Sequence, residues 1–262
     1  MITSSSNPQM KQAAAMLKKA KARNDADAYI VEGIRMVREI PKAQLLRVYA
    51  SESFLKEHTE MVSAAECVSD KVFKEISDTK TPQGIMAVVR QEHYTLEKMM
   101  RMDKNPLFLM LESIQDPGNL GTMLRMAEGA GATGIIMNRS TVDIYNPKVV
   151  RSTMGSVFRV PFVYVDDMTE AAKQLQSAGI HLYAAHLKGE NYYFQEDFRS
   201  SAAVMIGNEA AGLSDELSAM ADTYIKIPMA GQVESLNAAM AATILMYEAR
   251  RQRMSGEIKL QP

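Results

Sequence analysis

Residues 107–138 read LFLMLESIQDPGNLGTMLRMAEGAGATGIIMN, and this stretch decides the fold class. LFLML is a continuous apolar run, which is typical of a strand buried on both faces. Residues 119–130 have apolar side chains at helical spacing, and GIIMN (134–138) is a second apolar strand. This order predicts an α/β fold with a parallel sheet covered by helices.

The same alternation continues to the end of the chain. The expected elements are a helix over 146–159, a strand over 162–165, a helix over 168–179, strands over 181–186, 203–208 and 223–228, and a long helix from about 236 to 253. Ligands of such sheets bind beyond the carboxyl ends of the strands. We therefore expect the functional site in the loops that follow these strands.

The first third of the chain has a different pattern. We expect helices over 8–23, 29–40 and 51–58, and strands over 45–51 and 84–90. The sequence thus predicts a small α/β domain over 1–90, a polar linker with a short helix over 91–105, and a larger domain over 106–262.

Composition excludes several classes of protein. The chain has 262 residues, of which 47% are hydrophobic and 23% charged, as in ordinary globular proteins. Its single cysteine, Cys67, excludes an intrachain disulfide and a cysteine-based zinc site. No apolar run approaches the roughly 18 residues of a membrane span, and MITSSSNPQMKQ lacks the apolar core of a signal peptide. We expect a cytoplasmic protein without a metal.

Charge is distributed unevenly although the net charge is −1. Residues 1–105 hold 17 basic and 14 acidic side chains, and residues 106–262 hold 13 and 17. No acid interrupts the basic run formed by Lys11, Lys18, Lys19, Lys21 and Arg23. Such a run contacts nucleic-acid phosphates or forms a solvated helix face, and charge alone leaves both interpretations open.

One motif is misleading. GAGATG (129–134) matches the dinucleotide-binding pattern G-x-G-x-x-G, which requires a strand before it and a helix after it. Here a helix precedes the glycines and a strand follows them, which indicates a helix stop and a tight turn. A nicotinamide-dependent dehydrogenase is therefore disfavoured. The scattered histidines, including His186 at a strand end, are better interpreted as structural.

Three stretches follow apolar strands, where a site is expected. In ESIQDPGNLGTMLR (112–125), residues 116–118 form a turn, Asn119 is placed to cap a helix, and Arg125 lies about 9 Å further along it. IGNEAAGLSDE (206–216) has two glycines that allow close backbone approach to a ligand. IPMAGQVESLNAAMA (227–241) enters a helix whose first turn is expected to hold Ser235, Leu236 and Asn237, with amides suited to an anion.

Taken together, N-x-G-x-x-x-R, G-N-E-x-x-G-L-S and I-P-M-x-G-x-x-x-S-L-N resemble the three motifs of the SpoU-type (TrmH-like) RNA 2′-O-ribose methyltransferases of the SPOUT superfamily. The resemblance covers residues 107–253. YIVEGIRMV (29–37) is similar to the F-x-x-E-G-x-R-x-V signature of the ribosomal-protein-like substrate-binding domain that precedes the catalytic domain in many members. Residues 24–27 interrupt the basic run before that signature.

The resemblance implies a deep trefoil knot in the C-terminal domain and S-adenosyl-L-methionine as the cofactor. It also implies a homodimer with the C-terminal helix in the interface, which agrees with the nearly all-apolar residues 238–247. By motif position, the cofactor contacts are Ile206, Gly207, Asn208, Ile227, Met229, Ser235 and Leu236. The expected RNA contacts are Lys11, Lys18, Lys19, Lys21, Arg23 and Arg35.

The resemblance further implies four catalytic residues. The family position of Arg125 is a proposed general base, but a guanidinium seldom loses its proton and suits a phosphate or an oxygen gaining charge equally well. Asn119 would orient Arg125 or the ribose, Glu209 would hydrogen-bond the hydroxyl, and Asn237 would fix the loops. The favoured substrate is 23S ribosomal RNA. A tRNA 2′-O-methyltransferase and a non-catalytic RNA-binding protein of the same fold are the alternatives.

Overall fold

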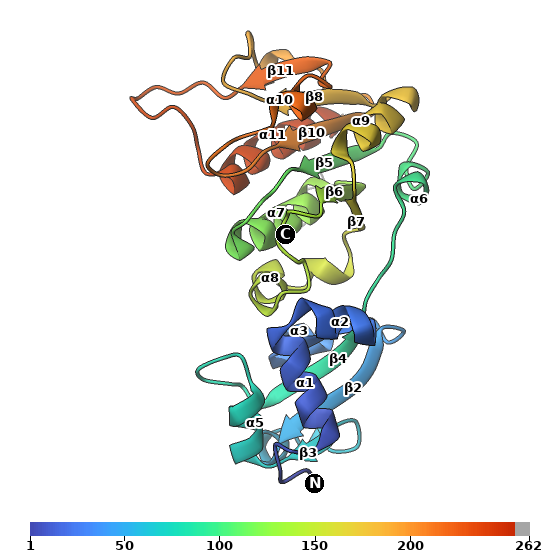
Figure 1. Ribbon diagram of the computed structural model, residues 1–262, viewed down its shortest axis with the longest axis vertical. Coiled ribbons are helices and arrows are strands. Elements are labelled where there is room, and N and C mark those ends of the chain that lie inside the picture. The colour runs from blue at the N-terminus through green and yellow to red at the C-terminus, as the bar shows by residue number, and fades with distance from the viewer. Residues whose placement is uncertain (255–262) are drawn as a thin grey trace. The chain divides into compact units, whose positions relative to one another are not determined.

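The computed structural model describes residues 1–254, which form two compact units. Unit 1 comprises Met1–Glu92 together with Asp143–Phe158, and unit 2 comprises His93–Val142 together with the chain from Arg159 onward. Figure 1 shows the elements of each unit. In the described part of the chain, no helix is long and apolar enough to cross a membrane.

Unit 1 is a four-stranded sheet with helices packed against it. Its elements are α1 (Pro8–Lys18), α2 (Ala20–Ala26), β1 (Ala28–Glu32), α3 (Ile34–Glu39), β2 (Leu45–Ser51), α4 (Glu52–Glu57), η1 (Thr59–Met61), β3 (Glu66–Val68), α5 (Asp70–Ile76), β4 (Ile85–Arg90), α8 (Pro147–Thr153) and η2 (Ser156–Phe158). The strand order is β1-β4-β2-β3, and only β2 and β3 pair in parallel. Apolar side chains of α1, α5 and the sheet form its core.

Two expectations for this unit are wrong. Residues 29–40 are a strand followed by a short helix: Tyr29–Val31 are all buried because helices cover this edge strand, and Gly33, at φ 95°, turns the chain. The expected helix over 8–23 is broken at Lys19, whose backbone is extended. The elements β3 and α5 escaped the sequence pattern, since three and seven residues give too little periodicity to detect.

The segment 143–158 belongs to unit 1 by its contacts, although the sequence pattern places it in the second domain. The Arg23 Nε donates to Asp143 Oδ2 at 3.0 Å, and the Tyr29 and Tyr145 ring centres lie 4.3 Å apart. The Glu92 amide donates to the Tyr145 hydroxyl at 2.9 Å. The domain boundaries at 90 and 106 stay a prediction.

Unit 2 is built on a seven-stranded sheet in which every pairing is parallel. Its elements are α6 (Leu96–Met100), β5 (Leu107–Leu111), α7 (Pro117–Ala130), β6 (Gly134–Asn138), β7 (Phe162–Val165), α9 (Met168–Ser177), β8 (His181–Ala185), β9 (Asn191–Tyr192), η3 (Tyr193–Gln195), β10 (Ala202–Ile206), α10 (Asp215–Ser218), β11 (Thr223–Lys226) and α11 (Ala238–Arg253). The strand order is β7-β6-β5-β10-β8-β11-β9. The predicted parallel α/β sheet is confirmed, and the knot stays a prediction.

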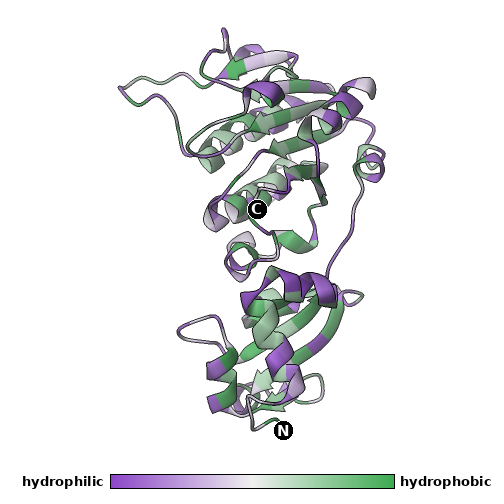
Figure 2. Cartoon of the chain, in the orientation of Figure 1, coloured by the Kyte–Doolittle hydropathy of each residue, from purple (hydrophilic) through white to green (hydrophobic). Residues whose placement is uncertain are grey.

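The central strands carry the core of unit 2. Every residue of β5 and β10 is buried, and Figure 2 shows the hydrophobic colour concentrated on the sheet. Leu96 and Met99 of α6, in the expected linker, pack into this core. Helices α7 and α11 pack together, and a side chain at Gly129 would meet the Tyr247 hydroxyl of α11.

Helix α7 begins two residues earlier than expected. Pro117 takes the first helical position, and the Asp116 carboxylate caps the helix by accepting from the Asn119 amide at 2.7 Å. Asn119 is therefore not the cap, and its side chain is available for other contacts. Gly131, at φ 73°, ends the helix and Gly134 opens β6, as expected of a helix stop.

Candidate active site

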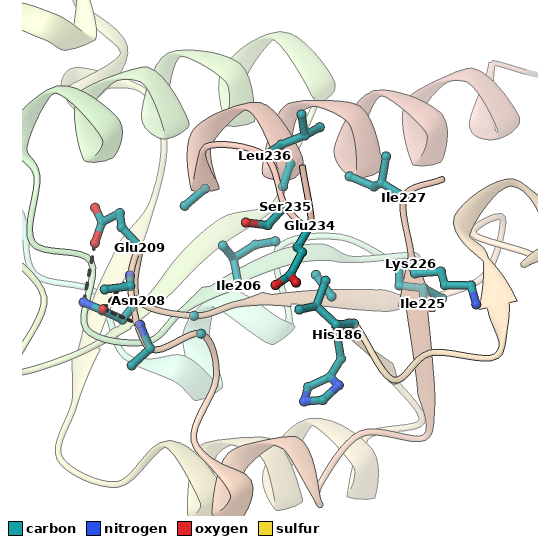
Figure 3. Close-up of a pocket in the computed structure, with 18 of the residues that line it drawn as sticks. His186, Ile206, Asn208, Glu209, Ile225, Lys226, Ile227, Glu234, Ser235 and Leu236 are labelled. Carbon is teal, nitrogen blue, oxygen red and sulfur yellow. Dashed lines mark hydrogen bonds between the residues drawn. The ribbon is translucent and has the colours of Figure 1, made fainter. Parts of the chain in front are cut away.

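A cavity of about 260 Å³ lies at the carboxyl ends of β8, β10 and β11 (Figure 3). Three loops line it, 185–187 after β8, 206–212 after β10 and 226–236 after β11, together with the start of α11. All the cofactor contacts expected from the motifs are among its lining residues: Ile206, Gly207, Asn208, Ile227, Met229, Ser235 and Leu236. The cavity thus gathers residues of three loops between positions 185 and 241 of the chain.

The loop after β10 closes tightly on itself. The Asn208 amide donates to the Gly212 carbonyl at 3.0 Å, and the Gly212 amide donates back at 2.9 Å. A Cβ atom at Gly207 would lie 2.0 Å from the Gly212 carbonyl carbon and 2.1 Å from the Leu213 nitrogen. Glycine at 207 is therefore required by the loop's own backbone, which shapes one wall of the cavity.

A strained residue begins the loop after β5. Ser113 has φ 58°, a conformation that side chains other than glycine rarely adopt. Asn138, at the end of β6, accepts from the Ser113 amide and donates to its hydroxyl, both at 2.9 Å. The Ser113 carbonyl accepts from the Asn208 side chain at 2.8 Å. These bonds hold the loop after β5 against the loop after β10.

The Glu209 carboxylate joins the same two loops. It accepts from the Gln115 amide at 3.2 Å, the Asp116 amide at 3.1 Å and the Asn119 side chain at 3.0 Å. Partial burial raises the pKa of Glu209, but the hydrogen bonds from Asn119 and backbone amides outweigh it and the pKa lies below its ordinary value. Glu209 is thus ionised at neutral pH, and its acceptor sites face donors of the protein.

Asn119 connects all three motifs. Its Nδ2 donates to Glu209, and its Oδ1 accepts from the Asn237 Nδ2 at 3.0 Å. Asn237 caps α11 by accepting from the amides of Ala239 and Met240. Ser235 and Leu236 therefore precede the helix rather than form its first turn. The Asn237 side chain occupies two of the amides of this helix start, and the anion site expected there stays a prediction.

Arg125 lies on the exposed face of α7. Within residues 1–254 its guanidinium forms no hydrogen bond or ion pair with the protein. The nearest acid in sequence, Glu128, pairs with Arg159, whose Nη2 donates to it at 3.1 Å. A cation that the fold leaves without a protein partner is available to an anionic ligand.

The residues expected to contact RNA lie in unit 1, away from these loops in the sequence. Lys11, Lys18, Lys19, Lys21 and Arg35 are exposed. Arg23 is only 3% exposed, because it pairs with Asp143 and donates to the Met16 carbonyl at 2.6 Å. We therefore leave Arg23 out of the RNA contacts.

The sequence assigns several cavity-lining residues to no site, among them His186, Leu187, Lys226 and Glu234, and His186 is interpreted there as structural. The first three follow or end β8 and β11, so their position at carboxyl strand ends was the available signal. His186 stacks on Tyr224 with ring centres 5.0 Å apart. Among the described residues, no group of His, Cys, Asp and Glu side chains is arranged to hold a metal ion.

Known proteins share this architecture. The sequence pattern of the SpoU rRNA Methylase family matches residues 106–247, and that of the MRM3-like substrate binding domain matches residues 7–87. The 23S rRNA (guanosine(2553)-2′-O)-methyltransferase RlmP of Bacillus subtilis is 33% identical over 88% of this chain and 91% of its own length. The 23S rRNA (uridine(2479)-2′-O)-methyltransferase of Streptomyces viridochromogenes is 31% identical over 98% and 94%.

Solved structures agree. The AdoMet-bound rRNA methyltransferase from Sinorhizobium meliloti has a TM-score of 0.85 at 30% identity, covering 97% of this chain and 98% of that one. The AviRb complex with AdoMet from Streptomyces viridochromogenes has a TM-score of 0.84 at 29% identity, covering 96% and 100%. The predicted enzyme class is confirmed: the chain belongs to the SpoU rRNA methylase family of S-adenosylmethionine-dependent RNA 2′-O-methyltransferases.

Proposed function

We propose that this protein methylates one ribose 2′-hydroxyl of 23S ribosomal RNA. The observation that carries the proposal is the hydrogen-bonded chain from Asn237 through Asn119 to Glu209, which joins three separate motifs beside one cavity. Relatives that match nearly the whole chain have names that specify 23S rRNA. A structure described as concerning tRNA methylation covers only 56% of this chain, which favours ribosomal RNA over tRNA.

The cavity suits S-adenosylmethionine. Ile206, Ile227 and Leu236 provide apolar walls, and the backbone of the Gly207 loop provides polar groups at close range. When bound, the cofactor supplies a methyl group made electrophilic by its sulfonium. The absence of a side chain at Gly207 lets the two sides of its loop approach each other, which keeps this wall in place.

Each catalytic residue has a distinct role in the proposal. Asn119 is fixed by Glu209 and Asn237, so it orients the ribose from a rigid position. Arg125 binds a phosphate of the RNA or stabilises the 2′-oxygen as it gains negative charge. Glu209 holds the loops after β5 and β10 together and does not accept the hydroxyl proton, because its carboxylate accepts hydrogen bonds from Gln115, Asp116 and Asn119.

Unit 1 supplies the electrostatic part of RNA binding in this proposal. Deleting residues 1–90 is a poor test, because it would uncover Tyr145, which is 6% exposed. Replacing Lys11, Lys18, Lys19 and Lys21 with glutamine leaves the core intact. We expect weaker RNA binding and a salt dependence whose slope falls by about one unit for each phosphate that the variant no longer neutralises. An unchanged slope would exclude these lysines.

We propose a homodimer that acts in the cytoplasm, with α7 and α11 in the interface. Met240 and Tyr247 of α11 are 61% and 48% exposed, which is unusual for large apolar side chains on one helix. Sedimentation of the full chain is expected to give twice the chain mass, and Met240→Glu is expected to give monomers. A wild-type monomer at micromolar concentration would contradict the proposal.

Mapping of ribose methylation in RNA from a strain lacking this protein tests the substrate. The expected result is the loss of one methylated position in 23S rRNA and its return with the wild-type gene. Loss of a tRNA position instead would assign the alternative substrate. Binding of S-adenosylmethionine without any lost methylation would support the non-catalytic alternative.

A further inference from the structure

Three aromatic residues at the edge of the unit 2 sheet have no role in the proposed reaction. Tyr192 ends β9, the edge strand of the sheet, and Tyr193 and Phe194 follow in η3. We name these three residues the aromatic rim. Tyr192 is 37% and Phe194 52% exposed. Leaving such rings in water forfeits the stabilisation that burial gives, so the rim requires an explanation.

The rings are arranged before any ligand binds. The Tyr192 and Phe194 rings are stacked, with centres 5.5 Å apart and planes 20° apart. Tyr193 packs edge-on against Phe194, with centres 5.3 Å apart and planes 77° apart. The edge-on contact fixes the orientation of Phe194. An exposed, oriented ring of this kind provides a flat surface for another flat ring.

A cation joins the rim to the cavity. The Lys226 Nζ lies 5.2 Å from the centre of the Tyr192 ring, and Lys226 also lines the cavity. In Figure 3 its side chain extends away from Ile206. The register explains this, because Lys226 of β11 pairs directly with Tyr192 of β9. One residue, Lys226, therefore contacts both the aromatic rim and the cavity where the methyl donor is expected to bind.

The charges beside the rim favour an anionic partner with flat rings. Lys226 lies over the Tyr192 ring, and the exposed Lys188 and Glu190 precede the rim in sequence. The carboxylates that follow the rim in sequence are engaged within the protein: Glu196 accepts from the Asn191 side chain at 2.7 Å, and Asp197 pairs with Arg199 at 2.7 Å. RNA combines phosphates with flat bases, whereas a protein partner supplies this combination rarely.

We propose, on the basis of the proposed function, that the aromatic rim binds an unpaired nucleobase of the RNA substrate near the methylated nucleotide. Phe194 stacks on the base, and Lys226 and Lys188 contact the adjoining phosphates. A base in a duplex is already stacked and its face is covered, so the rim selects single-stranded or looped RNA. The enzyme thereby recognises its target partly by base stacking beside the active site.

A double variant of the full chain and a matched control test the aromatic rim. The double variant Tyr192→Ala with Phe194→Ala is expected to bind a short single-stranded oligoadenylate at least about 10-fold more weakly than wild type. Its salt slope is expected to stay unchanged, because no cation is removed. Affinity for a short RNA duplex and for S-adenosylmethionine is expected to stay the same. Met102→Ala, which shortens an apolar side chain that is 43% exposed elsewhere in unit 2, is the control.

A second variant reports contact directly. The chain has no tryptophan, so Phe194→Trp introduces a single tryptophan at the rim, whose emission is excited separately from that of the tyrosines. Oligoadenylate is expected to quench its emission, and the duplex is expected to leave it unchanged. Unchanged oligoadenylate affinity in the double variant, or an unquenched tryptophan, would overturn the proposal. So would a change of oligomeric state in the double variant with RNA binding intact, which would identify a protein contact.

The binding readouts separate this inference from the proposed reaction. Both use oligoadenylate and need no methyl transfer, so they remain informative if 23S rRNA is not the substrate. If the double variant binds oligoadenylate as wild type does while wild type methylates 23S rRNA, the aromatic rim alone is refuted. If the double variant loses its affinity for oligoadenylate and the wild-type protein methylates no ribosomal RNA, only the proposed function is refuted.

Discussion

Two of the three loops that line the cofactor cavity are built in opposite ways. Residues 207–212 are held by two reciprocal backbone hydrogen bonds, and the Asn208 side chain accepts from two further amides of the same loop at 2.9 and 3.0 Å. Residues 228–236, within the described chain, take part in no backbone–backbone hydrogen bond, and Val233 is 62% exposed. In Figure 1 the segment between β11 and α11 extends away from the sheet.

The difference indicates which wall of the cavity is preorganised and which depends on the ligand. The first loop is preorganised, because its shape depends on contacts inside the protein. The second loop is tied at its end, through the bond from Asn237 to Asn119, and has few contacts before that point. A segment with few backbone hydrogen bonds and high exposure has low local stability. Ligand contacts thus contribute more to ordering the second loop than the first.

The largest expected effect contrasts one glycine of each loop. Gly207→Ala places a methyl group 2.0 Å from the Gly212 backbone, so the loop has to deform and cofactor affinity is expected to fall by about 100-fold or more. Gly231→Ala is the matched control, because a Cβ atom there meets nothing within 4 Å. Calorimetric titration with S-adenosylmethionine measures both. Equal affinities in the two variants would show that the first loop is not preorganised.

A second prediction concerns the reacting groups rather than the loops. Arg125→Ala is expected to lower single-turnover methyl transfer by about 100-fold and to leave cofactor affinity unchanged. Arg125→Lys is expected to restore little, because an ammonium lacks the planar fork of donors. Arg101→Ala, which removes an exposed arginine paired with Glu97, is the control. A wild-type rate in the alanine variant would remove Arg125 from the mechanism.

A third prediction tests the hydrogen bond from the Asn119 side chain to the Glu209 carboxylate, which connects two of the motifs. Folding lowers the pKa of Glu209 below its ordinary value of 4.5. The ionised Glu209 therefore contributes fully to the free energy of unfolding above pH 4.5, and this contribution is lost as the pH falls through the lowered pKa. Asn119→Ala removes one donor, and the pKa of Glu209 is expected to rise. Carbon-13 NMR titration of the Glu209 carboxyl measures the change.

Gln115→Ala is the control for this titration, because Gln115 donates to Glu209 through its backbone amide. The pKa of Glu209 is expected to stay low in that variant. An equal rise in both variants would mean that loop distortion, rather than the missing side-chain donor, sets the pKa.

The sequence predicted the order of unit 2 well because its strands are continuous apolar runs, such as 107–111 and 202–206, which are buried on both faces. The resemblance of the three motifs to those of the family also predicted that they form one site. It did not predict that Asp116, rather than Asn119, caps α7, because both residue types are good caps and only tertiary contacts with Glu209 and Asn237 decide between them.

Other features depend on contacts between distant residues and leave no local pattern. Arg23 looks like its neighbouring lysines in sequence, yet it is buried because Asp143, 120 positions later, pairs with it. The sequence predicts a helix over residues 29–40 because Ile30, Ile34, Val37 and Ile40 recur at helical spacing, although only Ile30 of these lies in the strand Ala28–Glu32. The contrast between the two cavity loops is of the same kind, since their hydrogen bonds follow from the folded backbone.

The smallest expected effect bears directly on that contrast. Limited proteolysis of the wild-type protein is expected to cut residues 228–236 before residues 207–212, because cleavage requires local opening and the second loop has fewer bonds to break. Saturating S-adenosylmethionine is expected to slow cleavage in 228–236 several-fold, since a ligand that binds the ordered loop stabilises it by mass action. Gly207→Ala is expected to abolish this protection while leaving the first cleavage site unchanged. Equal cleavage of the two loops, or protection that persists without cofactor binding, would mean that exposure alone and not hydrogen bonding distinguishes them.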